Sequence, residues 1–107
     1  MKRSEGVIYV AIGSDFIKEA IYSCYTLKKH NNIHCTLFTD EMKIIDVFDD
    51  VVLLESGIHP WKLKVQAMLS SPYLKTLYID ADTEIFGDIT FPFKLLEKND
   101  MVKLGLI

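Results

Sequence analysis

The sequence predicts an α/β fold with a mainly parallel sheet and helices on both of its faces. Apolar runs rich in β-branched residues recur along the chain, and helically spaced apolar residues lie between them. The runs are nearly unbroken, as in strands that are buried on both faces. The 107 residues, 50% of them hydrophobic and 25% charged, suffice for one hydrophobic core. We therefore expect a single domain over residues 1–107.

The first half of the chain predicts the order β-α-β-α-β. The apolar run over 7–12 is expected to form the first strand. A helix is expected to follow and to end at Asn31, because a series of apolar residues falls on one helical face: Ile17, Ala20, Ile21, Cys24 and Leu27. Strands are expected over 35–39 and 51–54, with a short helix over 40–48 between them.

The second half of the chain predicts two more helices and two more strands. Residues 61–70 have mostly helical apolar spacing, and Pro72 is expected to end that helix. A buried strand over 76–79 runs directly into an acidic segment. A short helix is expected over 93–97 and a last strand over 101–107. Strands that alternate with helices in this way favour parallel crossover connections.

Charge and length exclude several classes of protein. The 12 Lys and Arg against 15 Asp and Glu give a net charge of −3, with no basic stripe of the kind that binds nucleic acid. No apolar stretch is long enough for a transmembrane segment, and the first run is too short for a signal peptide. The two cysteines, Cys24 and Cys35, lack paired spacing and are expected to pack as reduced thiols. These features predict a cytoplasmic protein. Separately, Trp61, the single tryptophan, is expected to anchor the core.

Two carboxylates follow the predicted strand at 76–79. Ligands bind beyond the carboxyl ends of strands in open α/β sheets, and Asp80 and Asp82 come directly after this strand. If the backbone stays extended there, both carboxylates point into one small volume. They would repel each other unless a divalent cation lay between them, and hard oxygen ligands suit Mg²⁺ or Mn²⁺. The alternative is a solvated turn with no ligand.

The residues around these carboxylates extend the motif. The run Leu77–Thr83 (LYIDADT) is followed by Gly87-Asp88-Ile89, and Lys64 lies on the preceding predicted helix. Here the chain resembles the GT-A glycosyltransferases. Within them it resembles glycosyltransferase family 8, which includes glycogenin and bacterial lipopolysaccharide galactosyl- and glucosyltransferases. The resemblance covers nearly the whole chain and is most specific over 64–89.

The resemblance implies a Rossmann-like GT-A fold and a metal-dependent hexosyltransferase. Such an enzyme transfers a hexose from a nucleotide-sugar, here a UDP-sugar, to an acceptor with retention of the anomeric configuration. By the family's pattern, Asp80 and Asp82 would hold Mn²⁺ or Mg²⁺ against the two phosphates, with Asp80 also near the ribose. Ala81 would pass its backbone close to the ribose, and Lys64 would contact the diphosphate or the donor sugar.

The same pattern assigns three residues to the nucleotide base. Ala11 and Ile12, at the end of the first strand, would offer backbone groups to the base. Phe16 lies where the family often has a Tyr over the base. The substitution keeps a ring for stacking and removes the hydroxyl.

The family's catalytic domain is more than twice as long as this chain. Its later half brings a third metal ligand and most of the acceptor and donor-sugar pocket. We therefore expect residues 1–107 to be the N-terminal, nucleotide-sugar-binding part of a truncated GT-A domain, and no catalytic nucleophile or acid/base is assigned. The apolar edge at 101–107 is expected to favour pairing with a second copy of the chain.

Two other functions compete with glycosyl transfer. The first is a non-catalytic nucleotide-binding or interaction module derived from a truncated glycosyltransferase. The second is a haloacid-dehalogenase phosphatase, in which the first Asp of an Asp-x-Asp motif is the nucleophile. That motif usually has Thr or Val at the fourth position after the first Asp, and this chain has Glu84 there.

Overall fold

Five parallel strands form the sheet, with the order β3-β2-β1-β4-β5 across it. The computed structural model describes residues 2–41, 45–55, 57–97 and 100–104. The strands are β1 (Arg3–Ala11), β2 (Cys35–Thr39), β3 (Asp50–Leu53), β4 (Tyr73–Ile79) and β5 (Met101–Leu104). The helices are α1 (Ser14–His30) and α2 (Pro60–Leu69), and a 3-10 helix, η1 (Phe91–Lys94), precedes β5.

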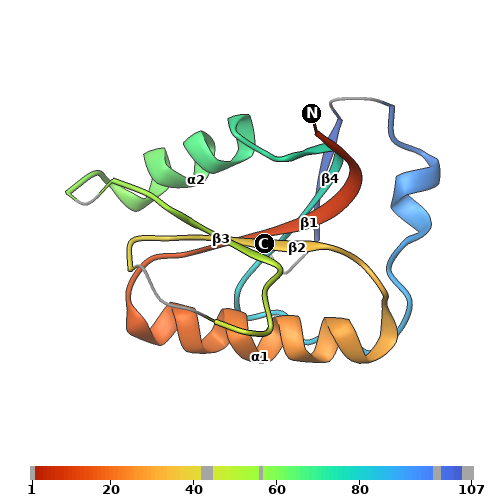
Figure 1. Ribbon diagram of the computed structural model, residues 1–107, viewed down its shortest axis with the longest axis horizontal. Helices are drawn as coiled ribbons and strands as arrows, with labels where there is room; N and C mark the ends of the chain where they lie inside the picture. The colour runs from red at the N-terminus through yellow and green to blue at the C-terminus, as the bar shows by residue number, and fades with distance from the viewer. Residues whose placement is uncertain (1, 42–44, 56, 98–99, 105–107) are drawn as a thin grey trace.

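The two α-helices cover opposite faces of the sheet (Figure 1). Helix α1 connects β1 to β2, and helix α2 connects β3 to β4. Strand β1 therefore pairs with β2 on one side and with β4 on the other, in parallel with both. The prediction of an α/β fold with a parallel sheet between helices is confirmed.

Strand residues alternate between the two faces of the sheet. In β1, Val7 and Tyr9 are buried on the α1 side, whereas Ile8 and Val10 are buried on the α2 side. Helix α1 contributes four residues at helical spacing to its layer: Ile17, Ala20, Cys24 and Leu27. Helix α2 contributes Leu63 and Ala67 to the other layer. Full burial of an aliphatic or aromatic side chain stabilises a fold by about 1.5–3 kcal/mol, so these two layers hold the sheet between the helices.

The helix expected over 40–48 is wrong for the part that the structure describes. Residues 40–41 and 45–48 form bends, turns and loop, and the remainder, 42–44, lies outside the described residues. Phe48 is nevertheless buried, with its ring edge-on to Tyr9 at a centroid distance of 5.6 Å. The apolar spacing therefore reflected burial in the core, which a loop also provides.

Several element boundaries differ from those expected. Strand β1 begins at Arg3 and β4 at Tyr73, because these two strand ends pair with each other. The last helical segment is the 3-10 helix η1 rather than a helix over 93–97. The last strand ends at Leu104, and the expected continuation over 105–107 lies outside the described residues. In the part of the chain that is described, no helix is long and apolar enough to cross a membrane.

Trp61 is exposed, contrary to its predicted role as a core anchor. Its relative exposure is 65%. Helix α2 directs Leu63 and Ala67 towards the sheet. Trp61 comes two positions before Leu63 and therefore lies on the opposite side of the helix, with its ring in solvent.

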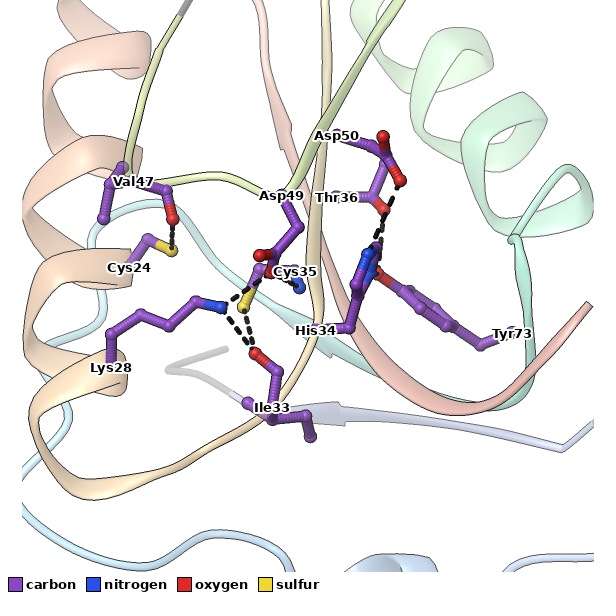
Figure 2. A network of polar contacts seen from close by, with 10 residues as sticks. All are labelled: Cys24, Lys28, Ile33, His34, Cys35, Thr36, Val47, Asp49, Asp50 and Tyr73. Atoms are coloured by element: carbon purple, nitrogen blue, oxygen red, sulfur yellow. Dashed lines mark hydrogen bonds and ion pairs between the residues drawn. The ribbon is translucent and has the colours of Figure 1, made fainter.

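A polar network joins the start of β3 to α1 and β2 (Figure 2). Lys28 Nζ lies 2.6 Å from Asp49 Oδ2, and the Cys35 N–H donates to the same oxygen at 2.7 Å. Burial acts to raise the pKa of Asp49, but these two hydrogen bonds outweigh it and lower that pKa. Cys24 and Cys35 are buried free thiols, as predicted. The neighbouring Cys24 thiol and burial raise the pKa of Cys35, which disfavours the reactive thiolate.

Candidate functional site

A pocket of about 330 Å³ lies at the carboxyl ends of β1 and β4. Strand order reverses here, because the chain leaves β1 towards β2 on one side and returns to β4 on the other. Crevices at such a reversal are the usual ligand sites of open α/β sheets. The pocket is lined by every residue that the sequence assigned to the site except Ala11: Ile12, Phe16, Lys64, Asp80, Ala81 and Asp82.

Ala11 does not line the pocket. Its side chain is buried in the layer between the sheet and α1, with 1% exposure. The chain leaves β1 immediately afterwards at Gly13, whose φ of 90° suits a glycine and whose N–H donates to Asp40 Oδ1 at 3.0 Å. This hydrogen bond anchors the β1–α1 turn, which contains Ile12 and leads into the first turn of α1, where Phe16 lies; both residues line the pocket.

A turn, rather than an extended backbone, brings Asp80 and Asp82 together. Strand β4 ends at Ile79, and the Thr83 N–H donates to the Asp80 carbonyl oxygen at 3.0 Å, which closes a turn over 80–83. The backbone is therefore not extended here, which was the condition for the two carboxylates to point into one volume, but Asp80 and Asp82 both line the same pocket. Asp80 is largely enclosed, with 18% of its side chain exposed, and Asp82 is exposed.

Lys64 and Phe16 approach the pocket from the two helices. Lys64 is an exposed residue of α2, and Phe16 lies in the first turn of α1 with 57% exposure. The predicted residues therefore bring a cation, two carboxylates and an accessible aromatic ring to this pocket. Such a set suits a ligand that has both an anionic part and a flat apolar part.

Five lining residues were not predicted from the sequence. Val10 and Pro60 are apolar, and the other three carry polar or charged groups: Glu19, Tyr78 and Lys103. Lys103 Nζ lies 3.5 Å from Asp80 Oδ1 and 5.9 Å from the centroid of the Tyr78 ring. Burial, together with the Asp80 carboxylate, raises the pKa of Tyr78 to about 12, so its hydroxyl stays neutral. One sequence signal pointed to Lys103, since it is the only charged residue in the apolar run over 101–107.

The donor set suits a cation that is shared with a phosphate ligand. Among the described residues, no group of three or more His, Cys, Asp or Glu side chains is placed to hold a metal ion. Asp80 and Asp82 supply hard oxygen ligands only. Mg²⁺ is commonly bound by one or two carboxylates, with substrate phosphates and water completing its shell. Asp80 and Asp82 therefore fit Mg²⁺ or Mn²⁺ bound together with a diphosphate.

Helix α1 fixes the segment that follows the acidic turn. Thr26 Oγ1 accepts a hydrogen bond from the Ile85 N–H at 2.9 Å. Asn31 is buried and bonds to this segment twice, since its Oδ1 accepts from the Ile89 N–H at 2.9 Å and its Nδ2 donates to the Gly87 carbonyl oxygen at 3.0 Å. Asn31, at the end of α1, therefore holds the Gly-Asp-Ile part of the motif in place. These three residues do not line the pocket.

A second hollow of about 400 Å³ adjoins the first on the α1 side of Asp82. Tyr22 and Glu84 lie on its rim, where the Tyr22 hydroxyl donates to Glu84 Oε1 at 2.9 Å. This hydrogen bond raises the pKa of Tyr22. Glu19, Ala81 and Asp82 line both hollows, so the acidic turn and α1 border each of them.

Comparisons with known proteins give no identification. No family model matches the chain, and a search of curated proteins finds no match. The function is therefore inferred from the pocket and its residues.

Proposed function

We propose that this chain binds a nucleotide-sugar, specifically a UDP-sugar, with Mn²⁺ or Mg²⁺ in the pocket at the ends of β1 and β4. We further propose that it is the donor-binding part of a retaining hexosyltransferase with the GT-A fold. One observation carries the proposal. Lys64 on α2 and the two carboxylates of the turn after β4, Asp80 and Asp82, line one pocket at the point where the strand order reverses.

The charged residues suit a diphosphate. Lys64 supplies a positive charge for the phosphate oxygens, and Asp80 and Asp82 would hold the cation. A cation held by these carboxylates would supply positive charge against the negative charge that develops on a departing nucleoside diphosphate. The fixed turn over 80–83 keeps the two carboxylates beside the pocket before a ligand arrives, which lowers the cost of ordering them.

The apolar side of the pocket suits a nucleoside. Phe16 offers an accessible ring on which a base can stack, and Ile12 adds apolar surface next to it. The second hollow shares Asp82 with the first and gives room for polar groups outside the nucleotide pocket. We assign the sugar and the acceptor to this second hollow.

Calorimetry with UDP tests the binding proposal. The wild-type chain is titrated with UDP in the presence and absence of MnCl₂, beside Asp82→Asn and the control Asp46→Asn, whose exposed carboxylate lies outside the pocket. We expect UDP to bind more tightly with manganese, and Asp82→Asn to remove about 10-fold or more of that gain. UDP binding that is independent of manganese in the wild type would contradict the cation-bridged site.

A second measurement separates the binding of a nucleotide-sugar from the transfer of its sugar. Hydrolysis or transfer of the sugar from UDP-glucose and UDP-galactose is followed by the release of UDP. Release that depends on manganese and is lost in Asp82→Asn supports a transferase. Manganese-dependent binding with no release supports the nucleotide-binding module and contradicts catalysis by this chain.

A further inference from the structure

Lys103 brings a second cation into the pocket from an edge strand. It is aligned with Tyr78 in the parallel pair of β4 and β5. From there its Nζ lies 5.9 Å from the centroid of the Tyr78 ring and 3.5 Å from Asp80 Oδ1. The side chain is 51% exposed, so the ammonium group is accessible to a ligand.

The contact between Lys103 and Asp80 is weak enough to break. Charge-assisted hydrogen bonds between an ammonium and a carboxylate are about 2.7–2.9 Å long, so a separation of 3.5 Å is loose. An ion pair that is half open to water contributes little to stability. A lysine in the apolar run of β5 therefore has small structural value, and its position over the pocket calls for another explanation.

The charges around the pocket leave one negative charge in excess. Three acidic residues (Glu19, Asp80 and Asp82) face two lysines (Lys64 and Lys103). A divalent cation that enters alone must compete with Lys103 for the Asp80 carboxylate. A cation that enters with a diphosphate does not, because the phosphate oxygens give Lys103 a new partner as it leaves Asp80.

We propose that Lys103 is an exchangeable counter-ion of this pocket, which pairs with Asp80 in the free protein and with the diphosphate of the bound nucleotide. This inference rests on the proposed nucleotide-binding function. Its consequence is a coupling between the two ligands. Lys103 opposes the cation by itself and favours the cation together with the nucleotide, so the pocket selects the pair over the free ion.

The test measures two affinities in Lys103→Met. Binding of manganese alone is followed by the electron paramagnetic resonance signal of the free ion, and binding of UDP is measured by calorimetry at saturating manganese. We expect Lys103→Met to bind manganese alone several-fold more tightly and UDP about 10-fold more weakly. Lys103→Arg, which keeps the charge, is expected to stay close to the wild type in both measurements.

Opposite changes in the two affinities distinguish this role from a structural one. A loss of structure would weaken both, and Lys62→Met, an exposed lysine of α2 that does not line the pocket, is expected to change neither. Wild-type protein that binds UDP with manganese, together with Lys103→Met affinities that are unchanged or move in the same direction, would overturn this inference alone. Wild-type protein that binds no UDP would overturn the proposed function and this inference with it.

Discussion

The ring of Tyr73 on β4 lies directly over Gly6 of β1. From there the Tyr73 hydroxyl reaches β2, on the far side of β1, where it lies 2.8 Å from Thr36 Oγ1. It also lies 2.7 Å from Nδ1 of His34, just before β2 (Figure 2). One side chain therefore ties three neighbouring strands together, and it does so at the end of the sheet opposite the pocket.

Replacement of Gly6 by alanine is expected to destabilise the protein. In a strand, alanine usually costs less backbone entropy than glycine, so the default expectation is a small gain in stability. Here a methyl group at position 6 would overlap the Tyr73 ring, and overpacking of this kind costs about 1–3 kcal/mol. Urea unfolding of Gly6→Ala measures the change. Gly87→Ala is the matched control, since a methyl group there meets no atom within 4 Å; a Gly6→Ala as stable as this control would contradict the contact.

The parts of the fold that follow from local pattern were predictable from the sequence. The residues of β2 and the apolar face of α1 were placed correctly, because period and length decide them. The turn around Phe48 was not, because burial against Tyr9 imposed a spacing that resembles a helix. The position of the Tyr73 ring over Gly6 was also unpredictable, since it depends on which strands are neighbours in the sheet.

In the candidate site too, the residues marked by a local pattern were predicted and those that depend on distant parts of the chain were not. Asp80 and Asp82 were found because a strand end carries the signal locally, and the sheet then placed them in a pocket. Lys103 was missed because its place in the pocket requires β5 to pair with β4, which no local pattern specifies. The role of Asn31 was underestimated for a similar reason, since its partners at Gly87 and Ile89 lie far along the chain.

The buried amide of Asn31 should be sensitive to a change of one atom. In Asn31→Asp the carboxylate still accepts from the Ile89 N–H, but it places an oxygen against the carbonyl oxygens of Leu27 and Gly87, to which Nδ2 now donates. Loss of buried hydrogen bonds with unsatisfied partners costs about 1–3 kcal/mol. Thermal unfolding is expected to show a clear decrease in Tm for Asn31→Asp. Asn32 is the exposed neighbour of Asn31, and Asn32→Asp is expected to change Tm very little. Equal effects in both variants would contradict a structural role for the hydrogen bonds of the Asn31 amide.

The pair of Lys28 and Asp49 is expected to make stability depend on acid pH. Because the pKa of Asp49 is lowered in the folded protein, its contribution is present above the ordinary pKa of 3.8 and is lost as the pH falls through the lower folded value. Asp49→Asn is therefore expected to cost about 0.5–1 kcal/mol at pH 7, and the cost should shrink below pH 4.

Urea unfolding at pH 7, 4 and 2.5 measures this dependence. Asp46→Asn is the control, because Asp46 is exposed and serves to show the effect of removing a negative charge alone. A difference between wild type and Asp49→Asn that stays constant over this range would show that the carboxylate charge has no part in the contact.

Lys64 supplies the clearest test of which charges recognise the ligand. It is exposed on α2 and lines the pocket, so its removal should leave the fold intact and weaken the anionic part of the binding. A hydrogen bond to a charged group is worth about 1.5–3 kcal/mol, which predicts a loss of about 10- to 100-fold in UDP affinity for Lys64→Met. Uridine, which lacks the phosphates, should bind Lys64→Met and the wild type equally.

Lys62→Met, on the same helix but outside the pocket, should leave both affinities unchanged, because the lysine must face the ligand and not merely add charge to α2. Equal losses of UDP affinity in Lys62→Met and Lys64→Met would assign the effect to the overall charge of the helix, and equal losses for UDP and uridine would place Lys64 beside the nucleoside instead of the diphosphate.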